Sequence, residues 1–112
     1  MVQVDMETLR RLEGSPLVGI DFETYSDVDI RKHGLDRYVS SPYFKPLIVA
    51  IAGIDRGNQV STSWELDEAG IALLLDFAEG QPLVAHNAAF ELAVFRHLGV
   101  DLTDSIVDSA VS

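Results

Sequence analysis

Cysteine is absent from this 112-residue chain, which excludes disulfide bridges, thiolate metal sites and cysteine redox chemistry. Basic residues are also scarce, because eight lysines and arginines stand against eighteen acidic residues and give a formal net charge of −10. This charge argues against a protein that binds polyanions over its whole surface. The objection weakens if some of the acids bind divalent cations, which reverse the local sign of the charge.

Long apolar runs are absent as well. No run approaches the length of a membrane-spanning helix, and the N-terminus lacks the basic start and apolar stretch of a signal peptide. We therefore expect a soluble cytoplasmic protein without a membrane segment. Hydrophobic residues make up 47% of the chain, which is ample for a core, and the length predicts a single domain over residues 1–112.

The stretch over residues 17–26 organises the chain. Its apolar side chains alternate with Asp21 and Glu23, which predicts a strand with both acids on one face and Ile20 and Phe22 on the other. Carboxylates about 7 Å apart along a strand repel each other and resist burial. A cation such as Mg²⁺ or Mn²⁺ between them removes both problems. The alternative is a strand that ends at Ile20, with both acids solvated in a turn.

The remaining pattern predicts an α/β fold with a mixed sheet, an antiparallel hairpin plus parallel strands, flanked by helices. The first strand should be central, with the hairpin antiparallel to it on one side and a parallel strand on the other. The first expected element is a helix over 5–13, with Asp5 as its N-cap and with Met6, Leu9 and Leu12 pointing inward. The hairpin consists of a strand over 47–54, which is expected to be covered on both faces, and a strand over 59–64. The remaining elements are a helix that Asp67 caps and Gly80 ends, a strand over 83–86, a helix over 88–98 and a strand from Ile106.

Residues 27–46 differ in character from the rest and are expected to form an irregular basic and aromatic insertion, with one helical turn over 35–39. The segment is either a nucleic-acid contact, through phosphates and stacked bases, or a structural flap with ordinary surface charges. Its basic and tyrosine residues are Arg31, Lys32, Arg37, Lys45, Tyr38 and Tyr43.

Glu91 falls near the middle of the apolar arc of the helix expected over 88–98. A glutamate in that position costs several kcal/mol unless something partners it. An exposed acid near a helix N-terminus is the alternative, and it gains little. A capping box with Asn87 as N-cap would need its acid at Phe90, so capping explains Asn87 but not Glu91. We expect a functional Glu91.

Asp21, Glu23 and Glu91 are therefore expected to converge at one edge of the sheet. Their carboxyl groups should lie roughly 4–7 Å apart, a distance that one or two divalent ions can span. Metal-assisted attack of water on a phosphodiester is the reaction class that uses such a cluster.

Three stretches of the sequence resemble one family. Asp21-Phe-Glu-Thr24 resembles the first motif, Asp-x-Glu, of the 3′–5′ exonucleases with four acidic residues (the DEDD superfamily), which include polymerase proofreading domains and have a ribonuclease-H-like fold. The stretch from His86 to Glu91 resembles their second motif, Asn-x-x-Phe-Asp, with glutamate as the acid. Residues 29–34, Tyr38 and 41–44 are similar to the segment after the first motif in phage-type polymerases of the DNA polymerase I family.

The resemblance implies a site with two Mg²⁺ or Mn²⁺ ions. Asp21 would bridge both ions, Glu23 would bind one of them, and Glu91 would serve the second. Asp108 is a lesser candidate because residues 106–109 are similar to a family strand that ends in Asp-Thr, and we favour its interpretation as a structural acid at a strand end over a role in the site. The implied substrate-binding residues are Thr24, Asn87 and Phe90.

The implied function is metal-dependent removal of nucleotides from the 3′ end of single-stranded DNA, in the proofreading manner, beside a downstream polymerase module. A phage-encoded chain would act in the cytoplasm of the host. The family's third motif, Tyr-x3-Asp or His-x4-Asp on a following helix, would supply the fourth carboxylate and the general base. It should lie well beyond Asp108, whereas the given sequence ends at Ser112. We therefore expect a fragment or split product, truncated before the last helix of the fold and weak or inactive alone.

Two alternatives remain open from the sequence. One keeps the fold and changes the substrate, as in an RNA-trimming exonuclease or another ribonuclease-H-like nuclease. The other is a non-catalytic remnant that binds nucleic acid or a partner. Metal binding at Asp21 and Glu23 separates the enzymes from the remnant.

Overall fold

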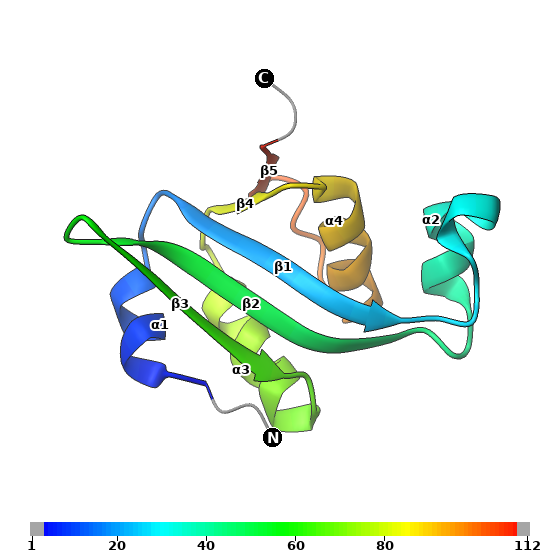
Figure 1. Ribbon diagram of the computed structural model, residues 1–112, viewed down its shortest axis with the longest axis horizontal. Coiled ribbons are helices and arrows are strands. Elements are labelled where there is room, and N and C mark those ends of the chain that lie inside the picture. The colour runs from blue at the N-terminus through cyan, green and yellow to red at the C-terminus, as the bar shows by residue number, and fades with distance from the viewer. Residues whose placement is uncertain (1–3, 110–112) are drawn as a thin grey trace.

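The computed structural model describes residues 4–109, which form one five-stranded sheet and four helices (Figure 1). The order of the strands across the sheet is β3-β2-β1-β4-β5. The elements in chain order are α1 (Met6–Leu12), β1 (Val18–Tyr25), α2 (Ile30–Ser40), β2 (Lys45–Asp55), β3 (Asn58–Glu65), α3 (Glu68–Ala78), β4 (Leu83–Ala85), α4 (Ala88–His97) and β5 (Ile106–Asp108).

The strand arrangement confirms the α/β fold class expected from the sequence. β1 lies at the centre, pairs antiparallel with β2 on one side and parallel with β4 on the other. β3 completes the hairpin with β2, and β5 lies parallel to β4. This mixed sheet flanked by helices is compatible with a ribonuclease-H-like arrangement. Within residues 4–109, no helix has the length and apolar character needed to cross a lipid bilayer.

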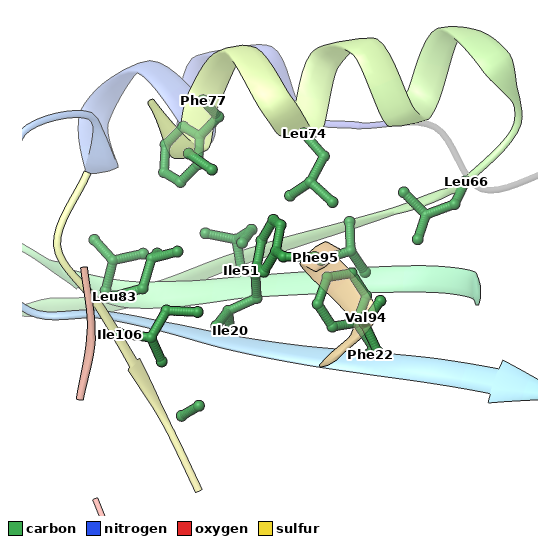
Figure 2. Close-up of a cluster of buried hydrophobic side chains, with 14 of the residues drawn as sticks. Ile20, Phe22, Ile51, Leu66, Leu74, Phe77, Leu83, Val94, Phe95 and Ile106 are labelled. Atoms are coloured by element: carbon green, nitrogen blue, oxygen red, sulfur yellow. The ribbon is translucent and has the colours of Figure 1, made fainter. Parts of the chain in front are cut away.

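The hydrophobic core lies on one face of the sheet. Side chains alternate along β1, so that Ile20 and Phe22 are buried while Asp21 and Glu23 on the other face are exposed. Figure 2 shows the buried cluster between the strands and the helices, where Phe22 meets Phe95 of α4 edge to face, with ring centroids 5.3 Å apart. Figure 1 shows α1, α3 and α4 behind the sheet, so the face that bears the acids has no helix over it in the described part of the chain.

This one-sided packing corrects two of the sequence expectations. The strand over 47–54 was expected to be covered on both faces, but Leu47 is 38% exposed and Ile54 is 53% exposed, because the helices pack against the opposite face. Met6 was expected to point inward with Leu9 and Leu12, yet it is 41% exposed, since the short α1 buries only the latter two of these apolar side chains. The N-cap at Asp5 is confirmed, with its carboxylate accepting from two backbone N–H groups.

The segment over 27–46 is more regular than expected. Instead of a single turn over 35–39, it contains α2, an eleven-residue helix that Asp29 caps by accepting from the backbone N–H of Arg31. Gly34 interrupts α2 with φ 84° and ψ 169°, a conformation that other residues rarely adopt. No residue of α2 is buried, so a burial pattern could not reveal the helix from the sequence.

Candidate functional site

The two acids of the first motif stand on the open face of β1. The strand continues past Ile20 to Tyr25, which rules out the alternative of a strand that ends before the acids. Its antiparallel partner β2 places small or apolar residues beside them, with Ala50 opposite Asp21 and Ile48 opposite Glu23. Both carboxylates are exposed to solvent, and the residues of β2 that pair with them are not basic.

The brevity of β4 makes room for the second motif. β4 has three residues and pairs with β1 only where Val84 lies opposite Gly19, two residues before Asp21. The chain leaves the sheet after Ala85 and enters α4 at Ala88. The first turn of α4 therefore lies beside the second half of β1, on the side opposite β2, and brings Glu91 towards Asp21.

Glu91 is buried, as the helical spacing of the sequence predicted, with an exposed fraction of 3%. Its Oε2 is the one fully buried side-chain oxygen or nitrogen in residues 4–109 that has no hydrogen-bond partner. Burial, together with the negative charge of Asp21, raises the pKa of Glu91 from 4.5 to about 8. The structure thus brings Asp21 close enough to Glu91 for its charge to disfavour the ionised form of Glu91.

The pair fits a divalent cation by its chemistry. Carboxylate oxygens are the ligands that Mg²⁺ and Mn²⁺ prefer, and a cation would give the unpartnered Oε2 of Glu91 the interaction that it lacks. No group of three or more His, Cys, Asp or Glu side chains in the described part of the chain is arranged to hold a metal ion. The structure therefore supports the pair of Asp21 and Glu91, while Glu23 as a third ligand stays a prediction.

Asn87 occupies the N-cap position of α4, as the sequence indicated. Its side chain, however, makes no capping hydrogen bond and is exposed. The backbone N–H of Ala88 instead donates to Oδ2 of Asp108, at 3.4 Å. The N-cap position is therefore confirmed without the side-chain hydrogen bond, and Asp108 has a structural role at the end of β5.

Tyr38 of α2 connects the remaining two residues of the expected substrate site. Its hydroxyl lies 2.8 Å from Oγ1 of Thr24, the residue after Glu23. Its ring packs against Phe90, the residue before Glu91, with centroids 6.3 Å apart. Thr24 and Phe90 are thus joined through a tyrosine to which the sequence analysis gave no role in the site. The position of Tyr38 in the sequence, between the two motifs, gives no indication that its side chain contacts both Thr24 and Phe90.

Histidine does not contribute to the pair of acids. His33, His86 and His97 are all exposed, and the ring of His97 packs edge to face on Phe44, at 4.8 Å between centroids. His86 was expected to be held in the structure at the end of β4, and its exposure corrects that expectation.

Comparison of the chain with known proteins gives no match to a family model, to a curated protein or to a solved structure. The functional interpretation therefore depends on the residues and geometry described above.

Proposed function

We propose that this chain carries the acidic site of a metal-dependent 3′–5′ exonuclease that acts on single-stranded DNA ends. The observation that carries the proposal is the buried carboxyl group of Glu91, whose Oε2 has no partner and whose pKa is raised to about 8 beside Asp21. Such a group costs stability, and a cation site is the simplest function that compensates for it. The resemblance of the two motifs supports the reaction type, and it adds a polymerase module as the partner.

Asp21 and Glu91 lie in different environments, which suits them to different roles in binding a cation and its substrate. Asp21 is exposed on the open face of the sheet, so a phosphodiester can approach it from solvent. Glu91 is held in a hydrophobic surrounding, where the ionised form is disfavoured at neutral pH unless a positive charge compensates it. Divalent cations held by Asp21 and Glu91, with Glu23 as a further ligand, would polarise the attacking water and neutralise charge on the phosphate.

Other side chains are placed to position the end of the strand. The exposed amide of Asn87 lies one helical turn before Glu91 and is not used in capping. The ring of Phe90 is half-buried and flanks the same turn, while Thr24 is held by Tyr38. The described residues offer no histidine beside the acids as a general base, whose help is typically worth about 10²–10⁴-fold, so we expect slow turnover from this chain alone.

The test is a single-turnover cleavage assay with excess protein, Mn²⁺ and a 5′-labelled single-stranded DNA oligonucleotide. We expect a slow ladder of products that shorten from the 3′ end. Asp21→Asn and Glu91→Gln should abolish the ladder, whereas Asp104→Asn, which removes the same charge at an exposed turn before β5, should leave it unchanged. An RNA oligonucleotide of equal length tests the alternative substrate.

Shortening that persists in Asp21→Asn, or that starts at the 5′ end, contradicts the proposal. Faster trimming of the RNA oligonucleotide than of the DNA oligonucleotide contradicts the proposed substrate but leaves the site intact. If turnover is below detection, saturable Mn²⁺ binding that depends on Asp21 decides between a catalytic site and a remnant.

A further inference from the structure

The charge of the molecule is unevenly distributed. The segment from Ile30 to Lys45 holds four of the eight basic residues of the chain and only one of its eighteen acids, Asp36. The rest of the chain carries the large negative excess. A local basic surface on an acidic protein attracts anions to that place alone.

The cations of α2 are available for an external partner. Arg31, Lys32 and Arg37 are all exposed, and none of them forms an ion pair with any residue in 4–109. The nearby acids Asp27 and Asp29 keep their negative charge, although Asp29 caps α2 and Asp27 accepts a hydrogen bond from the hydroxyl of Ser41. With Asp36 they leave the four cations of the segment an excess of one charge, in contrast to the large negative excess elsewhere in the chain.

α2 contacts both the edge of the core and the acidic site. None of its residues is fully buried, but Tyr38 and Val39 pack against the core, and the ring of Tyr38 lies edge to face on Phe44. Tyr38 also connects α2 to the site, through the hydroxyl contact with Thr24 on β1, the ring contact with Phe90 on α4, and a hydrogen bond from Oγ of Ser26 to the backbone oxygen of Tyr38 at 2.8 Å. Figure 1 shows α2 standing beside α4 beyond the end of β1.

Exposed aromatic rings accompany the basic residues. Tyr25, two residues after Glu23 at the end of β1, is 55% exposed, and Tyr43, between α2 and β2, is 66% exposed. Neither ring packs against another aromatic side chain in the described chain. Basic side chains interleaved with exposed aromatic rings are the surface that single-stranded nucleic acids bind, through phosphates and stacked bases.

We propose that α2 with Tyr25 and Tyr43 binds the single DNA strand upstream of the 3′ end, and that Tyr38 positions this surface relative to Asp21 and Glu91. The proposal rests on the proposed function for the polarity of the strand. Arg31, Lys32 and Arg37 contact phosphates, and the tyrosine rings stack on bases. The last nucleotide lies at the acids, so short oligonucleotides do not reach α2 and longer ones do.

Fluorescence anisotropy with 5′-labelled oligothymidylates of three and twelve nucleotides, in Ca²⁺ to prevent cleavage, tests the surface. In the variant Arg31→Gln/Lys32→Gln/Arg37→Gln we expect affinity for the twelve-mer to fall about tenfold or more at low salt. The slope of log affinity against log salt should fall by about 2, since each single-strand phosphate contact contributes roughly 0.7. Binding of the three-mer should not change.

The matched control is Arg10→Gln/Arg11→Gln/Arg56→Gln, which removes the same charge from exposed positions on α1 and in the β2–β3 turn, away from α2. It should change affinity for the twelve-mer by less than about threefold, because only the long-range field is altered. Equal losses in the two triple variants overturn the proposal. Tighter binding of a twelve-base-pair duplex or of a twelve-residue polyglutamate peptide than of the single strand also overturns it.

Tyr38→Phe tests the positioning role separately from folding. The variant loses the contact with Thr24 and keeps the ring packing, so we expect an unchanged melting temperature and a reduced preference for the twelve-mer over the three-mer. Combination with Thr24→Val should add little further loss, because both substitutions remove one shared contact. A lower melting temperature with an unchanged length preference makes Tyr38 merely structural and overturns its positioning role.

Mn²⁺ binding, measured on the same proteins, distinguishes this inference from the proposed function. If the α2 variant loses the twelve-mer while the wild-type chain shows no Mn²⁺ binding that depends on Asp21, the exonuclease proposal fails and the proposed path of the strand towards those acids fails with it. If Mn²⁺ binding depends on Asp21 but the α2 variant binds the twelve-mer normally, only the inference about α2 fails.

Discussion

Two buried polar side chains, Gln81 and Glu91, are each 3% exposed but differ in how their polar atoms are satisfied. The amide of Gln81 donates to the backbone oxygens of Ser15 and Pro82 and accepts from the backbone N–H of Gly14. The carboxyl group of Glu91 leaves Oε2 without any partner. The first residue therefore stabilises the fold, while the second costs stability and points to a function.

The raised pKa of Glu91 predicts a pH dependence of stability. Between about 4.5 and about 8 the folded state binds the proton of Glu91 and the unfolded state does not, so the free energy of unfolding should fall as pH rises through this window. The loss has an upper bound of about 5 kcal/mol at pH above 8. Urea denaturation from pH 5 to pH 9 should show this decline in the wild-type chain and a flatter profile in Glu91→Gln. If the free energy of unfolding depended on pH in the same way in both proteins, Glu91 would not be the cause of the decline.

Gln81 predicts a loss of stability without loss of metal binding. Gln81→Leu leaves the backbone groups of Gly14 and Ser15 without partners at the junction of α1 and β1. Water can reach both groups, since Gly14 is exposed and Ser15 is half-buried, so each lost hydrogen bond costs about 0.5–1.5 kcal/mol and the midpoint of urea denaturation should fall. Mn²⁺ affinity of the folded variant should stay as in the wild-type chain, and a specific loss of Mn²⁺ affinity would contradict the structural role of Gln81.

Sequence reasoning at this scale succeeded where the signal was local and failed where the partner lay far along the chain. The burial of Glu91 followed from helical spacing alone. The N-cap position of Asn87 was predicted correctly, but the side chain that accepts from the first turn of α4 is that of Asp108, which β5 brings from twenty residues away. Tyr38 was missed as a link between Thr24 and Phe90 for the same reason, since three elements have to pack before the contact exists.

At the scale of elements, the site depends on the difference in length between the neighbouring strands β1 and β4. β1 has eight residues and β4 has three, so β4 leaves the sheet early and α4 begins beside the acids of β1. The alternation of β1 and the order of the strands were predictable because both follow from apolar patterning and short connections. α2 was predicted only as one turn, because a helix that buries nothing has no apolar stripe to reveal it.

Substitution of Gly34 tests whether α2 can be destabilised without loss of protection in the sheet. At φ 84° and ψ 169° an alanine is strained, at a cost of about 1–3 kcal/mol, so Gly34→Ala should loosen α2. Hydrogen exchange should become faster in α2 while the strands of the sheet keep their protection, because α2 has no fully buried side chain and touches only the edge of the core. Faster exchange throughout the sheet would contradict an effect confined to α2.

At the scale of the whole molecule, packing and charge divide the protein in a consistent way. α1, α3 and α4 cover one face of the sheet, and the open face presents Asp21 and Glu23 (Figure 1). The body of the protein is acidic, and the basic residues of α2 stand beside the end of β1. Under the proposed function, this charge distribution would repel a DNA strand from most of the surface and attract it beside the acids that would hold the cations.

The central claim is that Asp21 and Glu91 bind a divalent cation, and electron paramagnetic resonance titration of Mn²⁺ at pH 8.5 tests it most directly. At this pH the ionised form of Glu91 predominates, so proton competition is small. The account predicts saturable binding to the wild-type chain, weakened at least about tenfold in both Asp21→Asn and Glu91→Gln and unchanged in Asp104→Asn. Absence of saturable binding in the wild-type chain, or equal affinities in all four proteins, would contradict the claim.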